Sequence, residues 1–300
     1  MAHSAKPAFP MQLLFSFLHT IPVGWRRSLL CTLALLYYHI DARRRLITLH
    51  NLTKAFPEKK IEEIQGIAKL SYRNVAMVAA EFADLPFWTK ENIGAILSVE
   101  GLEHCTAALR KNRGMLLFGA HFGNWELGPI ASSLLLKPLA FIYRPLDNNV
   151  LERLVTWARQ STGNRAVEKS SAMWSMVRVL RRNGIIGLLI DQNVASYEGV
   201  FVDYFGFSAC TTNGLAHLAL LTDTPAVPAF MVRLDDNRYR FVFGPAVDLV
   251  KTEDRENDVI ENTRIFTNII EAMVRQYPDQ WLWLHQRWKE RNETGSHRNF

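Results

Sequence analysis

Short apolar segments that alternate with helical ones constrain the fold of this 300-residue chain more than any other feature. A strand that is apolar on both faces must be covered on both faces, and a helical connection places it parallel to its neighbour. The pattern therefore predicts an α/β fold with a mainly parallel central sheet flanked by helices. We expect strands at 115–120, 139–143, 185–190 and 226–232, with 239–243 beside the last, and helices at 124–136, 148–160, 171–182, 211–221 and 256–277.

The amino-terminal segment, residues 11–40, is apolar but interrupted in the middle by proline, glycine and two arginines. A helix that crosses a membrane needs about 20 mostly apolar residues, so neither piece spans a bilayer alone. A hairpin packed on the main domain and a single tilted anchor are two alternatives. We expect two short helices that lie in the membrane interface, at 11–21 and 28–40, with Trp25, Tyr37 and Tyr38 at headgroup depth and Arg26 and Arg27 on anionic phosphates.

The positive charge is concentrated at the amino-terminal end. Residues 1–60 contain nine basic and two acidic side chains, whereas the other 240 residues contain 26 and 27. A basic segment on a neutral body indicates contact with an anionic surface, and its aliphatic runs favour a membrane over nucleic acid. We therefore expect a membrane-associating helical segment at 1–45 and an α/β domain at 46–300, with one or two amphipathic helices over 58–82 near its start.

Several classes of protein are disfavoured by missing motifs. The three cysteines lie far apart and form no CxxC pair, which fits a reduced, cytosol-facing protein. The string closest to a serine hydrolase elbow, GFSAC at 206–210, lacks the second glycine. The histidines form no HExxH motif, and no glycine-rich nucleotide loop is present. We expect no metal and no cofactor.

The strand expected at 115–120 runs directly into the sequence HFGNWE, which contains an ionisable pair. On a continuous helix His121 and Glu126 would point about 140° apart, so they meet only if His121 precedes the helix. Gly123 gives the turn its freedom and Asn124 can cap the helix. Glu126 would then fix the tautomer of His121, which acts as a general base. The alternative is a structural histidine and a surface glutamate.

The sequence GAHFGNWELG resembles the His-x-x-x-x-(Asp/Glu) motif of the glycerolipid and lipid A acyltransferases. Within this group the chain is most similar to the lipid A late acyltransferases, which include lauroyl and myristoyl transferases. The resemblance extends over nearly the whole chain, and the combination of blocks is far more specific than the motif alone. The further blocks are NLTKAFPE at 51–58, YRPLDN at 143–148, TWARQSTGN at 156–164, LLIDQN at 188–193 and WLWLHQRWK at 281–289.

The resemblance implies transfer of a fatty acyl group from acyl carrier protein, or from coenzyme A, to a hydroxyl of a membrane glycolipid. The acceptor would be a lipid A precursor, and the site of action the cytoplasmic face of the bacterial inner membrane. His121 and Glu126 fall on the family's catalytic pair, and Arg159 and Asp191 on two supporting positions. The family often has a second charged residue directly after the Asp191 position, where this chain has glutamine. This departure bears on the acceptor rather than on the reaction.

Each supporting residue also has a structural interpretation. Arg144 can hold a phosphate or phosphopantetheine group, or form a salt bridge with Asp147. Arg159 lies near the end of a helix, where it would stabilise the negative end of the dipole. Asp191 follows an apolar strand and can cap a neighbouring helix instead. We expect the remaining aromatic side chains to pack in the core or at a lipid-facing edge, namely Phe266, Trp281, Trp283 and Trp288. His217 and His285 lie among apolar residues, and we expect both to be core residues.

Two other functions fit the same sequence features. Other phosphoglycolipids, or lysophospholipids, are alternative acceptors for the same reaction. A membrane-bound lipid carrier would use a similar cleft without turnover, although a carrier has no need for a base such as His121.

Overall fold

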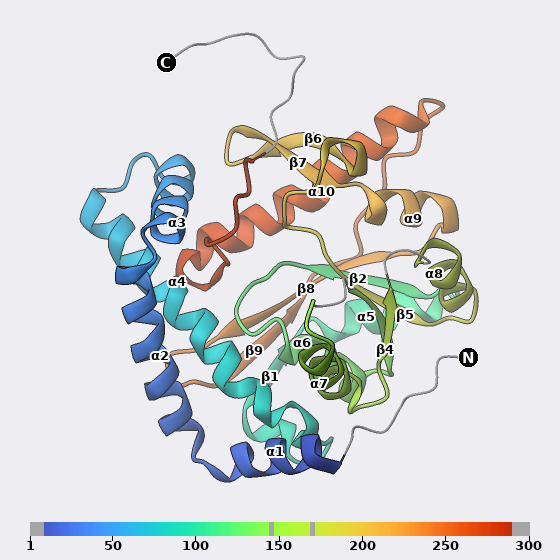
Figure 1. Ribbon diagram of the computed structural model, residues 1–300. Helices are drawn as coiled ribbons and strands as arrows, with labels where there is room; N and C mark the ends of the chain where they lie inside the picture. The colour runs from blue at the N-terminus through green and yellow to red at the C-terminus, as the bar shows by residue number, and fades with distance from the viewer. Residues whose placement is uncertain (1–8, 144–146, 169–171, 290–300) are drawn as a thin grey trace.

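A seven-stranded sheet forms the centre of the computed structural model, which describes residues 9–143, 147–168 and 172–289 (Figure 1). The strand order is β1-β9-β8-β2-β5-β3-β4. Neighbouring strands are parallel except for β8 and β9, which confirms the mainly parallel sheet. The strands are β1 (Leu97–Glu100), β2 (Met115–Gly119), β3 (Leu139–Tyr143), β4 (Arg165–Glu168), β5 (Ile185–Leu189), β8 (Ala226–Arg233) and β9 (Tyr239–Phe243).

Helices cover both faces of the sheet, as strands without a polar face require. In β2, Leu116 and Phe118 pack into the core beneath α8, α9 and α10. Met115 and Leu117 point to the opposite core, beneath α5 and α6. The helices of this part are α5 (Leu102–Arg110), α6 (Leu127–Leu135), α7 (Asn149–Gln160), α8 (Ala172–Arg181), α9 (Gly214–Thr222) and α10 (Arg255–Gln276), with short 3-10 turns η2 (Ile93–Ala95), η4 (Ser196–Glu198) and η5 (Pro278–Gln280).

Two strand features were not expected from the sequence. Strand β4 lies at the edge of the sheet and is only four residues long, with a charged residue at each end. A separate hairpin consists of β6 (Gly199–Tyr204) and β7 (Phe207–Thr212). Its turn residues, Phe205 and Gly206, both have positive φ, as type I′ hairpin turns require. Because β7 occupies residues up to 212, the helix expected from 211 begins only at Gly214.

The amino-terminal part forms four helices and one 3-10 turn along one side of the molecule (Figure 1). The break between the first two lies at residues 21 and 22. Each helix described is too short or too polar to cross a membrane. The boundary expected at residue 45 falls inside the third helix. These elements are α1 (Phe9–Thr20), α2 (Val23–Ile40), α3 (Ala42–Ala55), α4 (Ile61–Glu81) and η1 (Phe82–Phe87).

The two arginines of α2 do not face outward as expected. Arg26 is only 8% exposed and donates two hydrogen bonds to the Asp84 carboxylate, at 2.7 and 2.8 Å. Arg27 binds Glu81 at 2.7 Å. Tyr38, expected at headgroup depth, is buried as well. The expectation that Arg26 and Arg27 contact lipid phosphates was wrong, because buried carboxylates of the body need them as countercharges. Tyr38 packs edge-on against Tyr72 instead of facing the headgroups.

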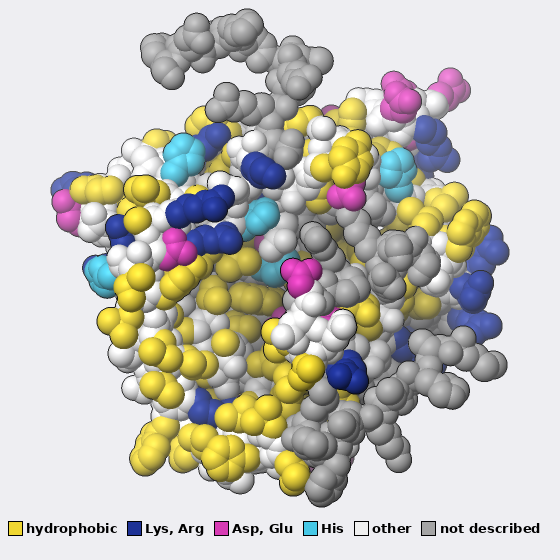
Figure 2. Space-filling model, viewed as in Figure 1, with side chains coloured by type: hydrophobic (Ala, Val, Ile, Leu, Met, Phe, Trp, Pro, Cys, Tyr) yellow, Lys and Arg dark blue, Asp and Glu magenta, His cyan; other side chains and the backbone are white. Residues whose placement is uncertain are grey.

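The outer face of α2 is nevertheless apolar and exposed. Its side chains recur every three or four residues, which places them on one face of the helix. Figure 2 shows apolar side chains gathered at the lower left, over α1 and α2, with lysine and arginine side chains above them. We call this surface the apolar stripe. Its members are Leu13, Leu14 and Phe17 of α1 and Trp25, Leu29, Leu33, Leu36 and Ile40 of α2.

Candidate active site

Two neighbouring strands place His121 and Asp191 side by side. Gly119 of β2 is in register with Leu189 of β5, and each polar residue follows its strand by two positions. The Nδ1 atom of His121 lies 2.9 Å from Oδ1 of Asp191. The backbone N–H of His121 donates to Oδ2 of the same carboxylate, also at 2.9 Å. Asp191 therefore fixes both the backbone and the ring of His121.

The turn that follows His121 has the conformation its sequence predicts. Gly123 has a φ of 56°, and a side chain there would collide with the carbonyl oxygen of Met231. The side chain of Asn124 accepts a hydrogen bond from the backbone N–H of Leu127, the first residue of α6, at 3.0 Å. Helix α6 starts three residues later than expected, so its N-cap position is held by Glu126 and not by Asn124.

Glu126 binds Arg159 and not His121. Its two carboxylate oxygens accept from Nε and Nη2 of Arg159, at 2.7 and 2.5 Å. The expected orienting bond from Glu126 to the imidazole is replaced by the bond from Asp191. The reason is geometric, since Asp191 arrives from the adjacent strand while α7 presents Arg159 to Glu126. Burial alone would lower the pKa of Arg159, but Glu126 raises it above its usual value.

The charges around His121 determine its protonation. Burial lowers its pKa, but the charge and hydrogen bond of Asp191, with the charge of Glu126, outweigh this and raise the pKa above that of an ordinary histidine. Burial would raise the pKa of Asp191, yet His121 and the Trp281 N–H lower it, so Asp191 stays ionised. A carboxylate at Nδ1 keeps the proton on that nitrogen and leaves Nε2 as the basic atom.

The carboxyl-terminal segment 280–282 packs against the turn that carries His121. Leu282 donates its backbone N–H to the carbonyl of His121 at 3.1 Å, and Gly123 donates to Gln280 at 2.9 Å. The Nε1 atom of Trp281 donates to Oδ2 of Asp191 at 2.8 Å. Of the two positions expected for Trp281, the core and a lipid-facing edge, the structure shows the core, but the sequence gave no sign of this contact.

One predicted site residue, Arg144, lies outside the described residues. The two histidines that were expected in the core have other positions. His285 is half-buried next to the site, and its Nε2 accepts from the backbone N–H of Asn193 at 2.8 Å. Burial lowers the pKa of His285 to about 4, so it is neutral at pH 7. His217, expected in the core, is exposed on α9.

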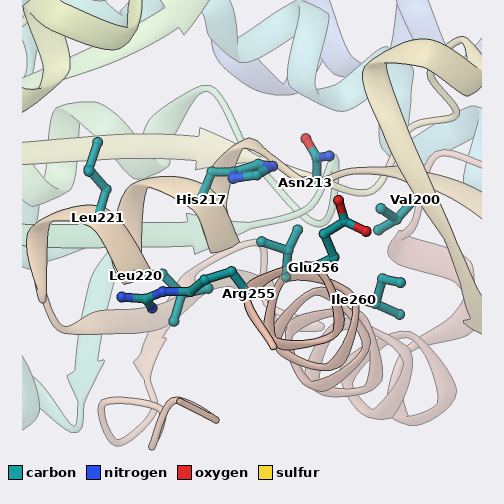
Figure 3. Close-up of a pocket in the computed structure, with 9 residues that line it drawn as sticks. Val200, Asn213, His217, Leu220, Leu221, Arg255, Glu256 and Ile260 are labelled. Atoms are coloured by element: carbon teal, nitrogen blue, oxygen red, sulfur yellow. The ribbon is translucent and has the colours of Figure 1, made fainter. Parts of the chain in front are cut away.

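A cavity of about 550 Å³ lies apart from this site, between α9 and α10 (Figure 3). His217 and Leu220 of α9, Glu256 and Ile260 of α10 and Val200 of β6 surround it. None of its lining residues is a predicted site residue. The site is therefore defined by the convergence of His121 and Asp191 at the sheet edge.

A histidine held by a buried carboxylate at the carboxyl edge of a parallel sheet is the arrangement of an α/β enzyme suited to general base catalysis. The sequence profile of the family described as bacterial lipid A biosynthesis acyltransferase matches residues 11–290. The chain belongs to this family of acyltransferases, which confirms the resemblance.

Individual relatives agree with this assignment. The chain is 29% identical over 275 residues to the lipid A biosynthesis lauroyltransferase of Escherichia coli K12, covering 91% of this chain and 87% of the relative. It is 28% identical over 251 residues to the palmitoleoyltransferase of the same strain, covering 83% and 80%. A phosphatidylinositol mannoside acyltransferase of Mycolicibacterium smegmatis is 24% identical over 242 residues, covering 79% and 77%.

The contacts predict different effects for the two carboxylates. Asp191→Asn should lower kcat by roughly 100-fold, because the imidazole loses its orienting charge. With His121 as the base, the acid limb of the pH–kcat profile should move to lower pH, because Asp191 no longer raises the pKa of the imidazole. Glu126→Gln leaves the orienting bond intact and should lower kcat less, by roughly 10-fold. Steady-state kinetics from pH 5 to 9 tests this, and a larger loss in Glu126→Gln would restore Glu126 as the orienting residue.

Proposed function

We propose that this protein transfers a fatty acyl group from a thioester of acyl carrier protein, or of coenzyme A, to a hydroxyl of a lipid A precursor. The observation that carries the proposal is the contact of His121 with the buried Asp191 in a chain of the lipid A acyltransferase family. The names of the E. coli relatives support a fatty acyl donor and a lipid A acceptor. In the proposed site Asp191 orients His121, while Glu126 holds Arg159.

In the proposed reaction the acceptor hydroxyl attacks the thioester carbonyl carbon directly. Nε2 of His121 takes the hydroxyl proton as the new C–O bond forms, and Asp191 stabilises the resulting imidazolium. The tetrahedral intermediate then collapses, the C–S bond breaks, and the imidazolium returns the proton to the leaving thiolate. The products are an ester and a free thiol, and His121 is again neutral. A positioned base of this kind contributes typically about 10²–10⁴-fold.

Glu126 and Arg159 contribute through charge in this proposal. The negative charge of Glu126 raises the pKa of His121, while the positive charge of Arg159 lowers it. The pair therefore adjusts the basicity of the imidazole without touching it. Arg159 is also the less buried member, with 28% of its side chain exposed, and can reach toward a substrate phosphate or carbonyl.

The second candidate function differs only in the acceptor. The mycobacterial relative is named for a phosphatidylinositol mannoside acceptor, and its similarity extends over most of both chains. Other phosphoglycolipids are therefore the alternative substrates of the same site. Incubation of the enzyme with each lipid and a radiolabelled acyl donor distinguishes them, since only a true acceptor becomes labelled.

His121→Ala should lose activity by at least about 100-fold, and intact-protein mass spectrometry during turnover should show no acylated enzyme. The reason is that His121 acts as a base and no nucleophile is required. His217→Ala is the matched control, because His217 is exposed on α9 beside the separate cavity. A stable acyl group on Ser, Cys or His, or near-normal turnover in His121→Ala, would contradict the mechanism.

We further propose that the apolar stripe holds the enzyme on the cytoplasmic face of the inner membrane. The acceptor's acyl chains stay in the bilayer, whereas the carrier protein is cytosolic, so the site must open at the interface. Arg43 and Arg44, exposed at the start of α3, follow the end of the stripe in the chain and can contact anionic headgroups. Burial of the stripe supplies the part of the binding that salt does not screen.

The triple variant Leu29→Gln, Leu33→Gln, Leu36→Gln should weaken binding to phosphatidylethanolamine–phosphatidylglycerol vesicles at both low and high salt. These side chains are exposed, so the fold should persist. Deletion of residues 1–45 is a poorer test, because it removes the Arg26 and Arg27 countercharges. Leu221→Gln, at an exposed leucine of α9, is the control. Unchanged vesicle sedimentation of the triple variant would contradict the role of the apolar stripe and place the membrane contact elsewhere.

A further inference from the structure

The side chain of Trp281 is held rigidly behind the active site. It is 1% exposed, and its ring packs against Tyr204 and Trp283 with centroid distances of 5.6 and 4.5 Å. Its backbone carbonyl accepts a hydrogen bond from Ser71 of α4 at 2.8 Å. Trp281 also forms a β-bridge with Phe122, the residue after His121. The indole N–H therefore has a fixed direction.

That direction is toward the carboxylate that binds His121. Trp281 Nε1 lies 2.8 Å from Oδ2 of Asp191, which also accepts the backbone N–H of His121, while Oδ1 faces the imidazole. With two donors on Oδ2, the carboxylate cannot rotate without breaking a hydrogen bond in a buried environment. An unsatisfied buried group of this kind is costly, so the plane of Asp191 is locked.

We infer that Trp281 is a positioning residue for the acyl transfer, acting through Asp191 on the imidazole of His121. The inference rests on the proposed function, because it matters only if His121 is the base. Its indole N–H sets the orientation of the carboxylate, and the carboxylate sets the direction of Nε2 toward the acceptor hydroxyl. Displacement of a catalytic group by a small distance reduces turnover strongly even when substrate binding is unchanged.

Trp283 provides a matched control two residues away. It is equally buried, packs edge-on against Trp281, and also uses its indole N–H in a hydrogen bond. Its acceptor, however, is the backbone carbonyl of Pro278. The two tryptophans thus differ mainly in whether the N–H reaches the catalytic carboxylate.

Trp281 should also influence the protonation of His121. The charged or titratable groups that act on this histidine are Asp191, Glu126, Arg159 and the neutral His285, and Arg287 and Tyr204 act on Asp191. None of them changes in Trp281→Phe. When the indole N–H of Trp281 is lost, it no longer draws negative charge from the Asp191 carboxylate. The carboxylate then interacts more strongly with the imidazolium form of His121 and favours it over the neutral form. The acid limb of the pH–kcat profile should therefore move to higher pH.

The test compares Trp281→Phe with Trp283→Phe in the full-length protein. We expect kcat of Trp281→Phe to fall by roughly 10-fold with KM within about twofold, and its acid limb to move upward, because a hydrogen bond to a charged group is lost. In Trp283→Phe the acid limb of the pH–kcat profile should stay at the wild-type pH, and the loss of kcat should be smaller. If Trp281→Phe does not fold, 3-benzothienylalanine at position 281 replaces the N–H by sulfur with the ring retained, and the same changes are expected.

A kcat loss in Trp281→Phe no larger than in Trp283→Phe, or an acid limb that does not move upward, would overturn the inference. The proposed function fails separately, through an active His121→Ala variant. If His121→Ala is inactive and the two tryptophan variants behave alike, the base is retained and only the positioning role is lost.

Discussion

The structure of the site depends on one buried carboxylate. Asp191 is 4% exposed and accepts from the backbone and ring of His121 and from Trp281. An ionised carboxylate at this depth is stable only because these donors replace water. The same bonds fix the imidazole, define its basic nitrogen and raise its pKa. The geometry of the proposed site therefore follows from the requirement to satisfy a single buried charge.

A second buried carboxylate, that of Glu81, connects the amino-terminal helices to the site. Glu81 at the end of α4 is buried and binds Arg27 of α2, Arg233 of β8, Tyr239 of β9 and Asn124 in the turn after His121. One carboxylate thus joins α2, which carries five of the eight residues of the apolar stripe, to the sheet and to the turn after His121. The surface proposed to contact the membrane and the proposed catalytic residue are connected through well-satisfied buried contacts.

The sequence was sufficient to predict the sheet and the turn at the site. Apolar runs marked β2, β5 and β8, and the glycine and asparagine after His121 indicated the turn that the structure contains. It was not sufficient to identify the partner of His121, because strand order in the sheet differs from order in the chain. Strand β5 lies beside β2 although β3 and β4 intervene, so Asp191 reaches His121 while the nearer Glu126 does not. Burial of Arg26 was missed for a similar reason, since its partner Asp84 is 58 residues away.

The most direct test of the account is the protonation of His121 itself. The ¹⁵N chemical shifts of imidazole nitrogens distinguish the two neutral tautomers, and a pH titration gives the pKa. Comparison with His121→Gln assigns the resonance. We predict that the neutral form of His121 carries its proton on Nδ1. We also predict that the pKa of the ring lies above the ordinary value of about 6.5. A ring protonated at Nε2, or a pKa below that value, would contradict the role of Asp191 and with it the proposed base.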